Sequence, residues 1–334
     1  MEGIIGTTYR CNAKCYMCGT WKFPTKPTEE IRPELLKKLP RMTFTNITGG
    51  EPFLRNDIQE IVEIVRPKTK RIVISTNGFF TNRIIEFAKD NRDVGFRISL
   101  EGLPRTNDQL RGIKNGFDKS LRTLLELKSL GLKDIGFGIT ISDTNAKDLL
   151  ELFRLANSMS LEFATAVTHN SYYFHKFDNQ IVDKAMVAGE LNKLIWEFLK
   201  SKRPKDWFRA YFNYGLINYI YGGKRLLPCE VGADVFYLDP FGKIRPCNGM
   251  DEIMGDLETH DFGDIWQSAE AQAARNKVAA CAKNCWMIGS ASPAMKKAFA
   301  KPAKWIIQNK FLPGKRDQFV LDFADKHLRE ELIP

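Results

Sequence analysis

The chain has 334 residues and a formal net charge of +10; 43% of its residues are hydrophobic and 27% are charged. This composition is typical of a globular protein with a full core and excludes a disordered chain. No apolar run is long enough to span a bilayer and no segment resembles a signal peptide, so we expect a cytoplasmic protein.

Strand-like and helix-like segments alternate from the N-terminus to about residue 168. Short runs rich in β-branched residues predict strands at residues 4–9, 43–48, 71–76, 94–100, 135–141 and 161–167. Amphipathic patterns predict helices at residues 57–65, 81–89, 117–130 and 145–157. Repeated βα units indicate a parallel sheet, and six are too few to close an eight-stranded barrel. The predicted fold class is α/β, a partial (β/α)6 TIM-like barrel.

The segments that carry chemically suggestive residues all follow predicted strands. They lie at residues 11–18, 49–52, 77–78, 101–102 and 169–170. In parallel βα folds, the loops at the C-terminal ends of the strands form the active site. We therefore expect these segments to lie on one face of the barrel.

The pattern changes in the second half of the chain. Residues 181–222 are predicted to be helical and are rich in aromatic residues, most of which we expect in the core. A hairpin is predicted over residues 235–245 and a helix over residues 264–280. The predicted domains are a barrel with a helical extension at residues 1–228, a small cysteine-containing domain at 229–290 and a basic tail at 291–334.

The basic tail has an unusual charge pattern. Residues 286–316 contain seven basic residues and no acidic residue, interleaved with aromatic and aliphatic residues, whereas the last eighteen residues are net negative. The basic stretch suits contact with an anionic membrane surface or a phosphorylated substrate. The alternative is a tail that wraps the body with its apolar face. Pro302 and Pro313 break any long continuous helix there.

All seven cysteines fall into two groups. The first is the CxxxCxxC run of Cys11, Cys15 and Cys18, and the second comprises Cys229, Cys247, Cys281 and Cys285. In a reducing compartment, closely spaced thiols are expected to be metal ligands rather than disulfides. Three thiolates can hold three irons of a cubane cluster and leave the fourth iron open, whereas four thiolates can close a cluster. A zinc site is the alternative for both groups.

The first cysteine group after the first strand, together with Gly49-Gly50-Glu51-Pro52 after the second, strongly resembles the radical S-adenosylmethionine (radical SAM) enzymes. The resemblance implies a 4Fe-4S cluster whose open iron binds S-adenosylmethionine (SAM). It also implies a reducing partner such as flavodoxin or ferredoxin. The reaction implied is reductive cleavage of SAM to a 5′-deoxyadenosyl radical, which abstracts hydrogen from a substrate.

The same resemblance implies a set of residues that hold SAM. Ser99 and Arg111 would bind the methionine carboxylate, and Ser75 and Asn77 would lie near the ribose. Met17 and Asn107 depart from the family, which often has an aromatic residue and a histidine at these positions. The complete implied set is Gly49, Gly50, Glu51, Pro52, Ser75, Asn77, Ser99, Glu101 and Arg111.

The second cysteine group resembles the auxiliary-cluster region known as SPASM, in its shortened twitch form. Cys229, Gly242 and Cys247 have the spacing of its opening, although the CxxxC spacing of the last pair departs from the usual CxxC. No cysteine is left for a further cluster, so the resemblance implies one auxiliary 4Fe-4S cluster. Its expected role is electron transfer with the substrate radical or support of the pocket.

An oxidation would also require a group that takes a proton. Glu230 directly follows an auxiliary ligand and resembles, in its placement, the catalytic acid of the anaerobic sulfatase-maturating relatives. His169 and Tyr172, in the segment after the sixth strand, are the other catalytic candidates. His175 and Tyr173 lie in the same segment.

We expect the substrate to be a small polar molecule, such as a sugar, cyclitol or nucleotide-linked compound, in keeping with the positive charge of the chain. A peptide-modifying enzyme is the alternative, although the first predicted strand begins almost at Met1 and leaves no room for a leader-binding domain. A nucleic-acid-modifying enzyme is a third possibility, but the chain has no recognisable binding module. A ferredoxin-like electron carrier would leave the Gly-Gly-Glu-Pro turn and Arg111 unexplained.

Overall fold

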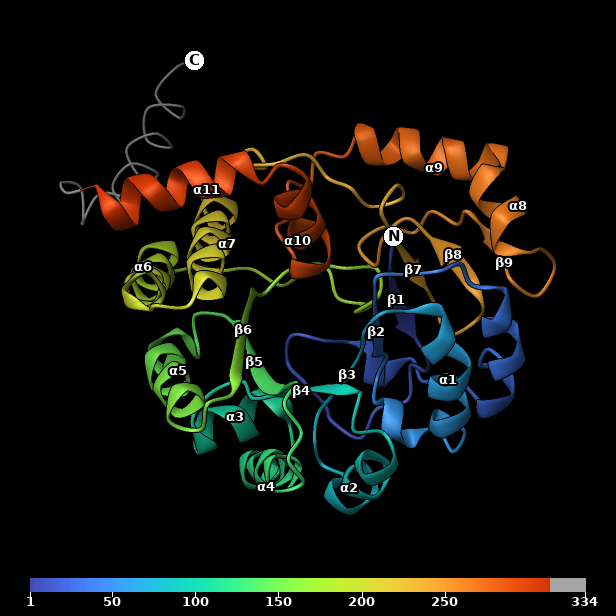
Figure 1. The fold of residues 1–334 in the computed structure, drawn as a ribbon, viewed down its shortest axis with the longest axis horizontal. Coiled ribbons are helices and arrows are strands. Elements are labelled where there is room, and N and C mark those ends of the chain that lie inside the picture. Colours follow the sequence, from blue (N-terminus) through green and yellow to red (C-terminus); the bar gives the residue numbers. More distant parts are fainter. Residues whose placement is uncertain (313–334) are drawn as a thin grey trace.

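The computed structural model describes residues 1–312; Lys315, Arg316 and the acidic last eighteen residues lie outside the described residues. Six parallel strands occur where the sequence predicts them and form an arc (Figure 1). They are β1 (Glu2–Gly6), β2 (Phe44–Thr48), β3 (Ile72–Thr76), β4 (Gly95–Ser99), β5 (Ile135–Ile141) and β6 (Glu162–Val167). Each pairs with the next in the chain, which confirms the partial barrel.

Helices cover the outer face of the arc (Figure 1). They are α1 (Ile58–Val65), α2 (Thr81–Asp90), α4 (Gly116–Ser129), α5 (Leu149–Ser158), and the antiparallel pair α6 (Lys184–Lys200) and α7 (Pro204–Ile220). Helix α3 (Pro104–Arg111) instead packs against α4, and its end contacts the segment of residues 14–16. The core between sheet and helices contains Ile47, Ile74 and Ile98, which are at most 1% exposed. Burial of this apolar layer is the main force that holds the helices on the sheet.

Two helices differ from the sequence prediction. Helix α3 was not predicted, because only Leu110 among its eight residues is a large hydrophobic and no apolar stripe marks it. Its boundaries are nevertheless visible in the sequence, since Pro104 stands in its first turn and Gly112 ends it in the left-handed conformation. The predicted helix over residues 264–280 is divided into α8 (Phe262–Gln267) and α9 (Ala269–Ala279), because the Ser268 side chain accepts a hydrogen bond from the Ala271 amide and caps α9.

The cysteine-rich second part of the chain continues the barrel sheet. Strand β7 (Val235–Leu238) pairs in parallel with β1, and β8 (Lys243–Arg245) and β9 (Gly255–Asp256) extend the sheet with antiparallel strands. The predicted hairpin is therefore present. Because β7 lies beside β1, the chain segment that carries the second cysteine group is placed next to the strand that leads into the first.

The described part of the basic tail, up to residue 312, packs on the body. Helix α10 (Ile288–Lys297) lies across the open side of the arc between α7 and β7 (Figure 1), and α11 (Ala300–Ile306) is followed by a π-helical turn (Ile307–Phe311). Met295 and Ile306 are buried. Phe299, Ile307 and Phe311 are more than half exposed. None of the helices in residues 1–312 combines the length and apolarity that a bilayer-spanning segment needs.

The inner face of the arc is polar. Asn46, Ser75, Arg97 and Thr140 are partly exposed and alternate with buried isoleucines or phenylalanines. Since successive side chains of a strand point to opposite faces, these polar residues face away from the helices and line the inside of the barrel. The barrel interior can therefore receive a polar ligand.

Acid stability should depend on Asp134, which accepts hydrogen bonds from Arg71 (2.7 and 2.9 Å) and Arg97 (2.7 Å). Burial raises the pKa of Asp134, but the two guanidinium groups outweigh burial and lower the pKa to about 2. Because the pKa of Asp134 is lower in the folded protein than in the unfolded chain, the ionised carboxylate stabilises the fold at pH values above the unfolded pKa of about 3.9. This stabilisation is lost as the pH falls towards 2.

We expect Asp134→Asn to lower the free energy of unfolding at pH 7 by about 1 to 2 kcal/mol, since the partly exposed pair is screened by solvent. Urea denaturation between pH 2 and 7 measures this. The difference between the variant and the unmodified protein should shrink below about pH 4. A difference that stays constant down to pH 2 would contradict the assignment.

Candidate active site

The first cysteine loop is held between two other parts of the barrel. The Lys14 and Tyr16 amides donate to the carbonyls of Arg111 (3.0 Å) and Leu110 (2.8 Å) at the end of α3. On its other side, the Gly19 amide donates to the Phe174 carbonyl (2.7 Å) in the segment after β6. These bonds fix the backbone on which the three cysteines stand.

The thiols of the first group lie close enough to influence one another. Burial raises the pKa of Cys11 to about 11 and that of Cys15 to about 12, and the charges of neighbouring cysteines add to this, while Arg111 opposes it. Three clustered thiols beside one guanidinium form a donor set of the kind that iron-sulfur clusters use. Among residues 1–312, no group of three His, Cys, Asp or Glu side chains is arranged to hold a single metal ion.

The Gly-Gly-Glu-Pro turn contacts the backbone directly before Cys11. The Gly50 amide donates to the Thr8 carbonyl (2.6 Å) and the Glu51 amide to the Arg10 carbonyl (2.8 Å). A Cβ atom on Gly50 would lie 2.2 Å from the Arg10 carbonyl oxygen, so only glycine permits this approach. The turn therefore sets the position of the cysteine loop, and Pro52, which is buried, begins the short 3-10 turn that follows.

Glu51 organises the loop after β3. Its side chain is 0% exposed and accepts hydrogen bonds from the Thr76 hydroxyl (2.7 Å), the Asn77 amide (2.8 Å) and the Phe53 amide (3.1 Å). Burial raises the pKa of Glu51 despite these donors. Because protein groups occupy both carboxylate oxygens, we infer that Glu51 acts on a ligand through the position of the turn.

Two predicted residues, one near the end of β3 and one directly after it, connect this part of the chain to its neighbours. The Asn77 side chain donates to Asn12 (2.6 Å), which lies directly after Cys11. The Ser75 hydroxyl donates to Asn46 (2.9 Å) on the inner face of β2. Both predicted residues therefore lie on the side of the sheet that faces the barrel interior.

Glu101 and Arg111 form a buried pair beside the cysteines. The Arg111 Nη1 atom lies 3.3 Å from Glu101 Oε1, and the Thr140 amide donates to the other Glu101 oxygen (2.6 Å). Asn107 accepts a hydrogen bond from the Glu101 amide (2.9 Å), so the residue that departs from the family holds this turn.

Arg111 Nε is buried and has no hydrogen-bond partner among residues 1–312. Buried donors normally have a hydrogen-bond partner, so this unpaired guanidinium N–H is suited to bind an anionic ligand. Ser99 lies on the inner face at the end of β4.

The four cysteines of the second group lie close enough to influence one another in pairs. Burial raises the pKa of Cys247 to about 12, and the charges of Cys285 and Cys229 add to this. The pKa of Cys285 is likewise raised by burial and by Cys229 and Cys281. Cys229 and Cys247 pack with Ile4 of β1 against a small valine cluster. Thiols are the protein ligands of iron-sulfur clusters, so this group is the candidate auxiliary site.

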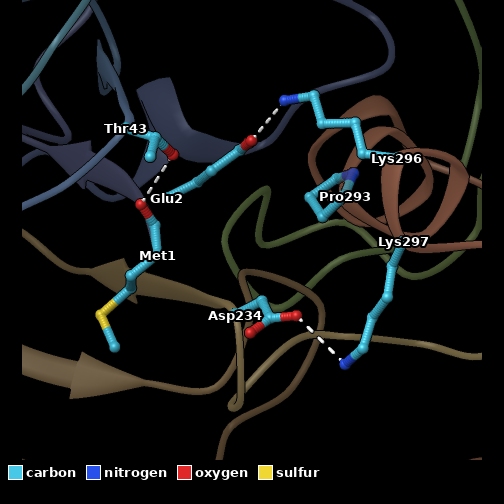
Figure 2. Close-up of a pocket in the computed structure, with 7 residues that line it drawn as sticks. All are labelled: Met1, Glu2, Thr43, Asp234, Pro293, Lys296 and Lys297. Atoms are coloured by element: carbon cyan, nitrogen blue, oxygen red, sulfur yellow. Dashed lines mark hydrogen bonds and ion pairs between the residues drawn. The ribbon is translucent and has the colours of Figure 1, made fainter.

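The structure does not bring Glu230 to the edge that carries the other predicted residues. Its carboxylate accepts a hydrogen bond from Lys297 (2.7 Å), which also contacts Asp234 (3.3 Å). Figure 2 shows Lys297 and Asp234 beside Met1 and Glu2, where β1 begins, lining a cavity of about 420 Å³. Glu230 is thus placed with the N-terminal ends of β1 and β7, opposite the cysteine loop.

His169 and Tyr172 lie on the expected side. The His169 Nδ1 atom is 3.0 Å from the Val167 carbonyl, so this nitrogen carries the proton, and Nε2 is buried without a partner among residues 1–312. Burial lowers the pKa of His169, which keeps the ring neutral. A hydrogen bond to Asp251, followed by burial, raises the pKa of Tyr172. The Arg245 guanidinium lies 5.0 Å from the ring centre of Tyr172.

A buried acid beneath the cysteine loop was not predicted. Glu30 accepts hydrogen bonds from Arg10 (2.8 and 2.7 Å), from Thr25 (2.7 Å) and from Thr8, and all of these fix the backbone that leads into Cys11. Burial raises the pKa of Glu30, but its donors outweigh burial and lower it. No motif marks Glu30, because its partners are far apart in the sequence.

Comparison with known proteins identifies the family. The model of the radical SAM superfamily matches residues 5–156, and that of an iron-sulfur cluster-binding domain, SPASM, matches residues 229–286. The chain is 32% identical over 308 residues to pre-heme d1 synthase of Dinoroseobacter shibae, a match that covers 81% of this chain and 74% of that protein. It is 36% identical over 164 residues to Fe-coproporphyrin III synthase of Methanosarcina barkeri, a match that spans 46% of this chain and 40% of that protein.

The fold has solved counterparts. The AdoMet-bound structure of anSMEcpe superposes with a TM-score of 0.62 at 14% identity and covers 91% of this chain and 99% of that chain. This chain belongs to the radical SAM superfamily. Within that superfamily, it carries the SPASM iron-sulfur cluster-binding domain. Its cofactors are therefore a 4Fe-4S cluster and SAM, with auxiliary iron-sulfur binding in the SPASM domain.

Proposed function

We propose that this radical SAM enzyme removes a hydrogen atom from a small anionic molecule bound inside the barrel. The observation that carries the proposal is the polar inner face of the sheet, which ends at the cysteine loop. When bound, the cluster and SAM supply the radical that abstracts the hydrogen atom, and an electron donor such as flavodoxin or ferredoxin supplies the electron.

The residues proposed to hold these groups are the predicted ones. Cys11, Cys15 and Cys18 ligate the first cluster. The unpaired Nε–H of Arg111 suits the SAM carboxylate, and Ser99 lies on the same inner face. The turn at Gly49 and Gly50 keeps the backbone close to the cysteine loop, and Asn77 ties that loop to β3. Glu51 and Glu101 keep these parts in place.

The formal net charge of the chain, +10, favours an anionic substrate. Four basic side chains near the N-terminal ends of the strands pair with three carboxylates, so this cluster, which lies at the end opposite the cysteine loop, adds only a small positive excess. They are Arg71 and Arg97 with Asp134, and Lys205 and Arg209 with Glu162 and Asp206. Two relatives above 30% identity are named for Fe-coproporphyrin III and pre-heme d1 synthesis, which supports a carboxylate-bearing substrate such as a tetrapyrrole.

We propose an oxidation in which the substrate loses a hydrogen atom to the deoxyadenosyl radical, an electron to the auxiliary site and a proton to a protein base. Cys229, Cys247, Cys281 and Cys285 are the proposed auxiliary ligands. His169 is the favoured base, because its neutral ring has a free Nε2 acceptor. Tyr172 is the second candidate on that side.

The experiment is a substrate panel with the reduced, anaerobically reconstituted enzyme. Iron coproporphyrin III, glucose 6-phosphate, UDP-glucose and a cysteine-containing peptide are each added with SAM, and 5′-deoxyadenosine is quantified. We expect an anionic small molecule to raise 5′-deoxyadenosine formation above the substrate-free rate, with deuterium transferred from labelled substrate. Stimulation by the peptide alone would contradict the proposal.

Peptide modification is the second candidate, because several relatives are named as peptide maturation proteins. They include mycofactocin maturase MftC of Mycolicibacterium smegmatis at 26% identity and the sporulation killing factor maturation protein SkfB of Bacillus subtilis at 24% identity. The peptide arm of the panel decides between the two candidates.

Replacing Glu230 should leave the chemistry intact. We expect Glu230→Gln to cleave SAM and turn over substrate at rates within about twofold of the unmodified enzyme, since its carboxylate is paired with Lys297 at the opposite end of the barrel. His169→Gln is the comparison and should lower turnover by about 100-fold, the scale of general base catalysis. A loss of turnover in Glu230→Gln, with normal 5′-deoxyadenosine formation, would restore Glu230 as the base.

A further inference from the structure

The segment after β6 physically connects the two cysteine groups. Its Ser171 hydroxyl (2.7 Å) and its Tyr173 amide (3.0 Å) both donate to the carbonyl of Asn248, the residue that follows Cys247. On the other side, Thr20 donates to the Tyr173 carbonyl (3.2 Å), and the amide of Gly19, the residue after Cys18, donates to the Phe174 carbonyl (2.7 Å). The backbone around residue 173 is therefore bonded to residues that directly follow a cysteine of each group.

The Tyr173 side chain extends this connection to a third element. Its hydroxyl donates to the carbonyl of Gly49 in the Gly-Gly-Glu-Pro turn, and the residue is 6% exposed. The ring lies 6.0 Å from that of Tyr9, next to the cysteine loop, and 5.4 Å from that of Tyr237 on β7. Burial raises the pKa of Tyr173, followed by the charge of Cys18, so the phenol stays protonated and can only donate to this carbonyl.

The hydroxyl makes a contact that ring packing alone does not provide. Phenylalanine would pack between Tyr9 and Tyr237 equally well, whereas only the phenol can hold the Gly49 carbonyl. That carbonyl belongs to the turn that sets the distance between the cysteine loop and β2. Tyr173 alone would therefore transmit a displacement of Asn248 to the Gly-Gly-Glu-Pro turn.

We propose that Tyr173 is a positioning residue that couples the second cysteine group to SAM binding. The inference rests on the proposed function for its assignment of the two sites. The occupied auxiliary site fixes Asn248, Asn248 fixes the backbone of Tyr173, and the Tyr173 hydroxyl fixes the turn beside SAM. SAM affinity is thus higher when the Cys247 group is intact.

The first test is Tyr173→Phe in the reconstituted holoenzyme. SAM affinity is measured by equilibrium binding and by the change that SAM causes in the EPR spectrum of the reduced cluster. We expect the dissociation constant to rise about 3- to 10-fold, the value of one hydrogen bond, with unchanged iron content. Tyr211→Phe, in the core of α7, is the matched control and should leave SAM affinity unchanged. Equal affinity in Tyr173→Phe and the unmodified enzyme overturns the inference.

The second test is a double-mutant cycle with Cys247→Ser. We expect Cys247→Ser to weaken SAM binding in the unmodified background and to do so less in the Tyr173→Phe background. If the effects of the two substitutions on the free energy of SAM binding are additive, the proposed coupling is wrong. Should Tyr173→Phe fail to fold, Ser171→Ala, which removes a side-chain bond to Asn248, replaces it in the same cycle. If the unmodified holoenzyme does not bind SAM, the proposed function itself is refuted. This outcome differs from failure of the coupling alone, in which the unmodified enzyme binds SAM.

Discussion

Replacing Cys15 with alanine is expected to abolish 5′-deoxyadenosine formation. Cys15 is the middle cysteine of the first group, is buried, and shares its pocket with Cys11, Cys18 and Arg111. With two thiolates left, the first cluster lacks one of the three ligands that the open-iron arrangement needs. The variant should keep about four irons per chain, all in the second group.

The backbone bonds of the cysteine loop make this variant interpretable. Because the Lys14 and Tyr16 amides anchor the loop to α3, loss of one side chain should not unfold it. Lys14→Ala is the control, since its side chain is exposed and the neighbouring backbone is unchanged. Anaerobic assay with dithionite and SAM, followed by chromatography of the nucleoside, measures the result. Unchanged 5′-deoxyadenosine formation in Cys15→Ala would contradict the ligand assignment.

Arg111→Gln should have the second largest effect. The substitution removes the cation that pairs with buried Glu101 and that lies beside the cysteines. Breaking a buried ion pair from one side costs about 3 kcal/mol in the free energy of unfolding, because the remaining carboxylate loses its partner. Loss of a guanidinium from the SAM carboxylate should also weaken SAM binding by about 100-fold or more.

Two variants separate these effects. Arg105→Gln, on the exposed side of the same helix, should change neither stability nor SAM affinity. Arg111→Lys keeps the charge without the planar fork, so it should recover more stability than SAM affinity. Urea denaturation and equilibrium SAM binding provide the two readouts. Normal SAM affinity in Arg111→Gln would show that this arginine serves only the fold.

The sequence predicts the barrel because the features that build it are local. The strands are β-branched runs of five to seven residues, and the loops after them carry the motifs. Helix α3 escaped prediction because it lacks an apolar stripe. The pairing of β7 with β1 could not be predicted either, since it joins residues more than 200 positions apart and no local pattern encodes a parallel partner.

The candidate site shows the same limit. The cysteines, Glu51, Glu101 and Arg111 stand in motifs with fixed spacing, so their positions follow from the strand order. Glu30 carries no motif and depends on a threonine and an arginine brought together by folding. Glu230 illustrates the converse, because adjacency to Cys229 in the sequence does not determine the direction of its side chain, which points to Lys297.

The metal content of the unmodified protein tests the central claim most directly, namely that each cysteine group holds a four-iron cluster. Iron, acid-labile sulfide and zinc are quantified after anaerobic reconstitution. We predict about eight irons and about eight sulfides per chain, without stoichiometric zinc, and about four irons in Cys247→Ser. Four irons with one zinc in the unmodified protein would contradict the account, because the second group would then be a structural zinc site.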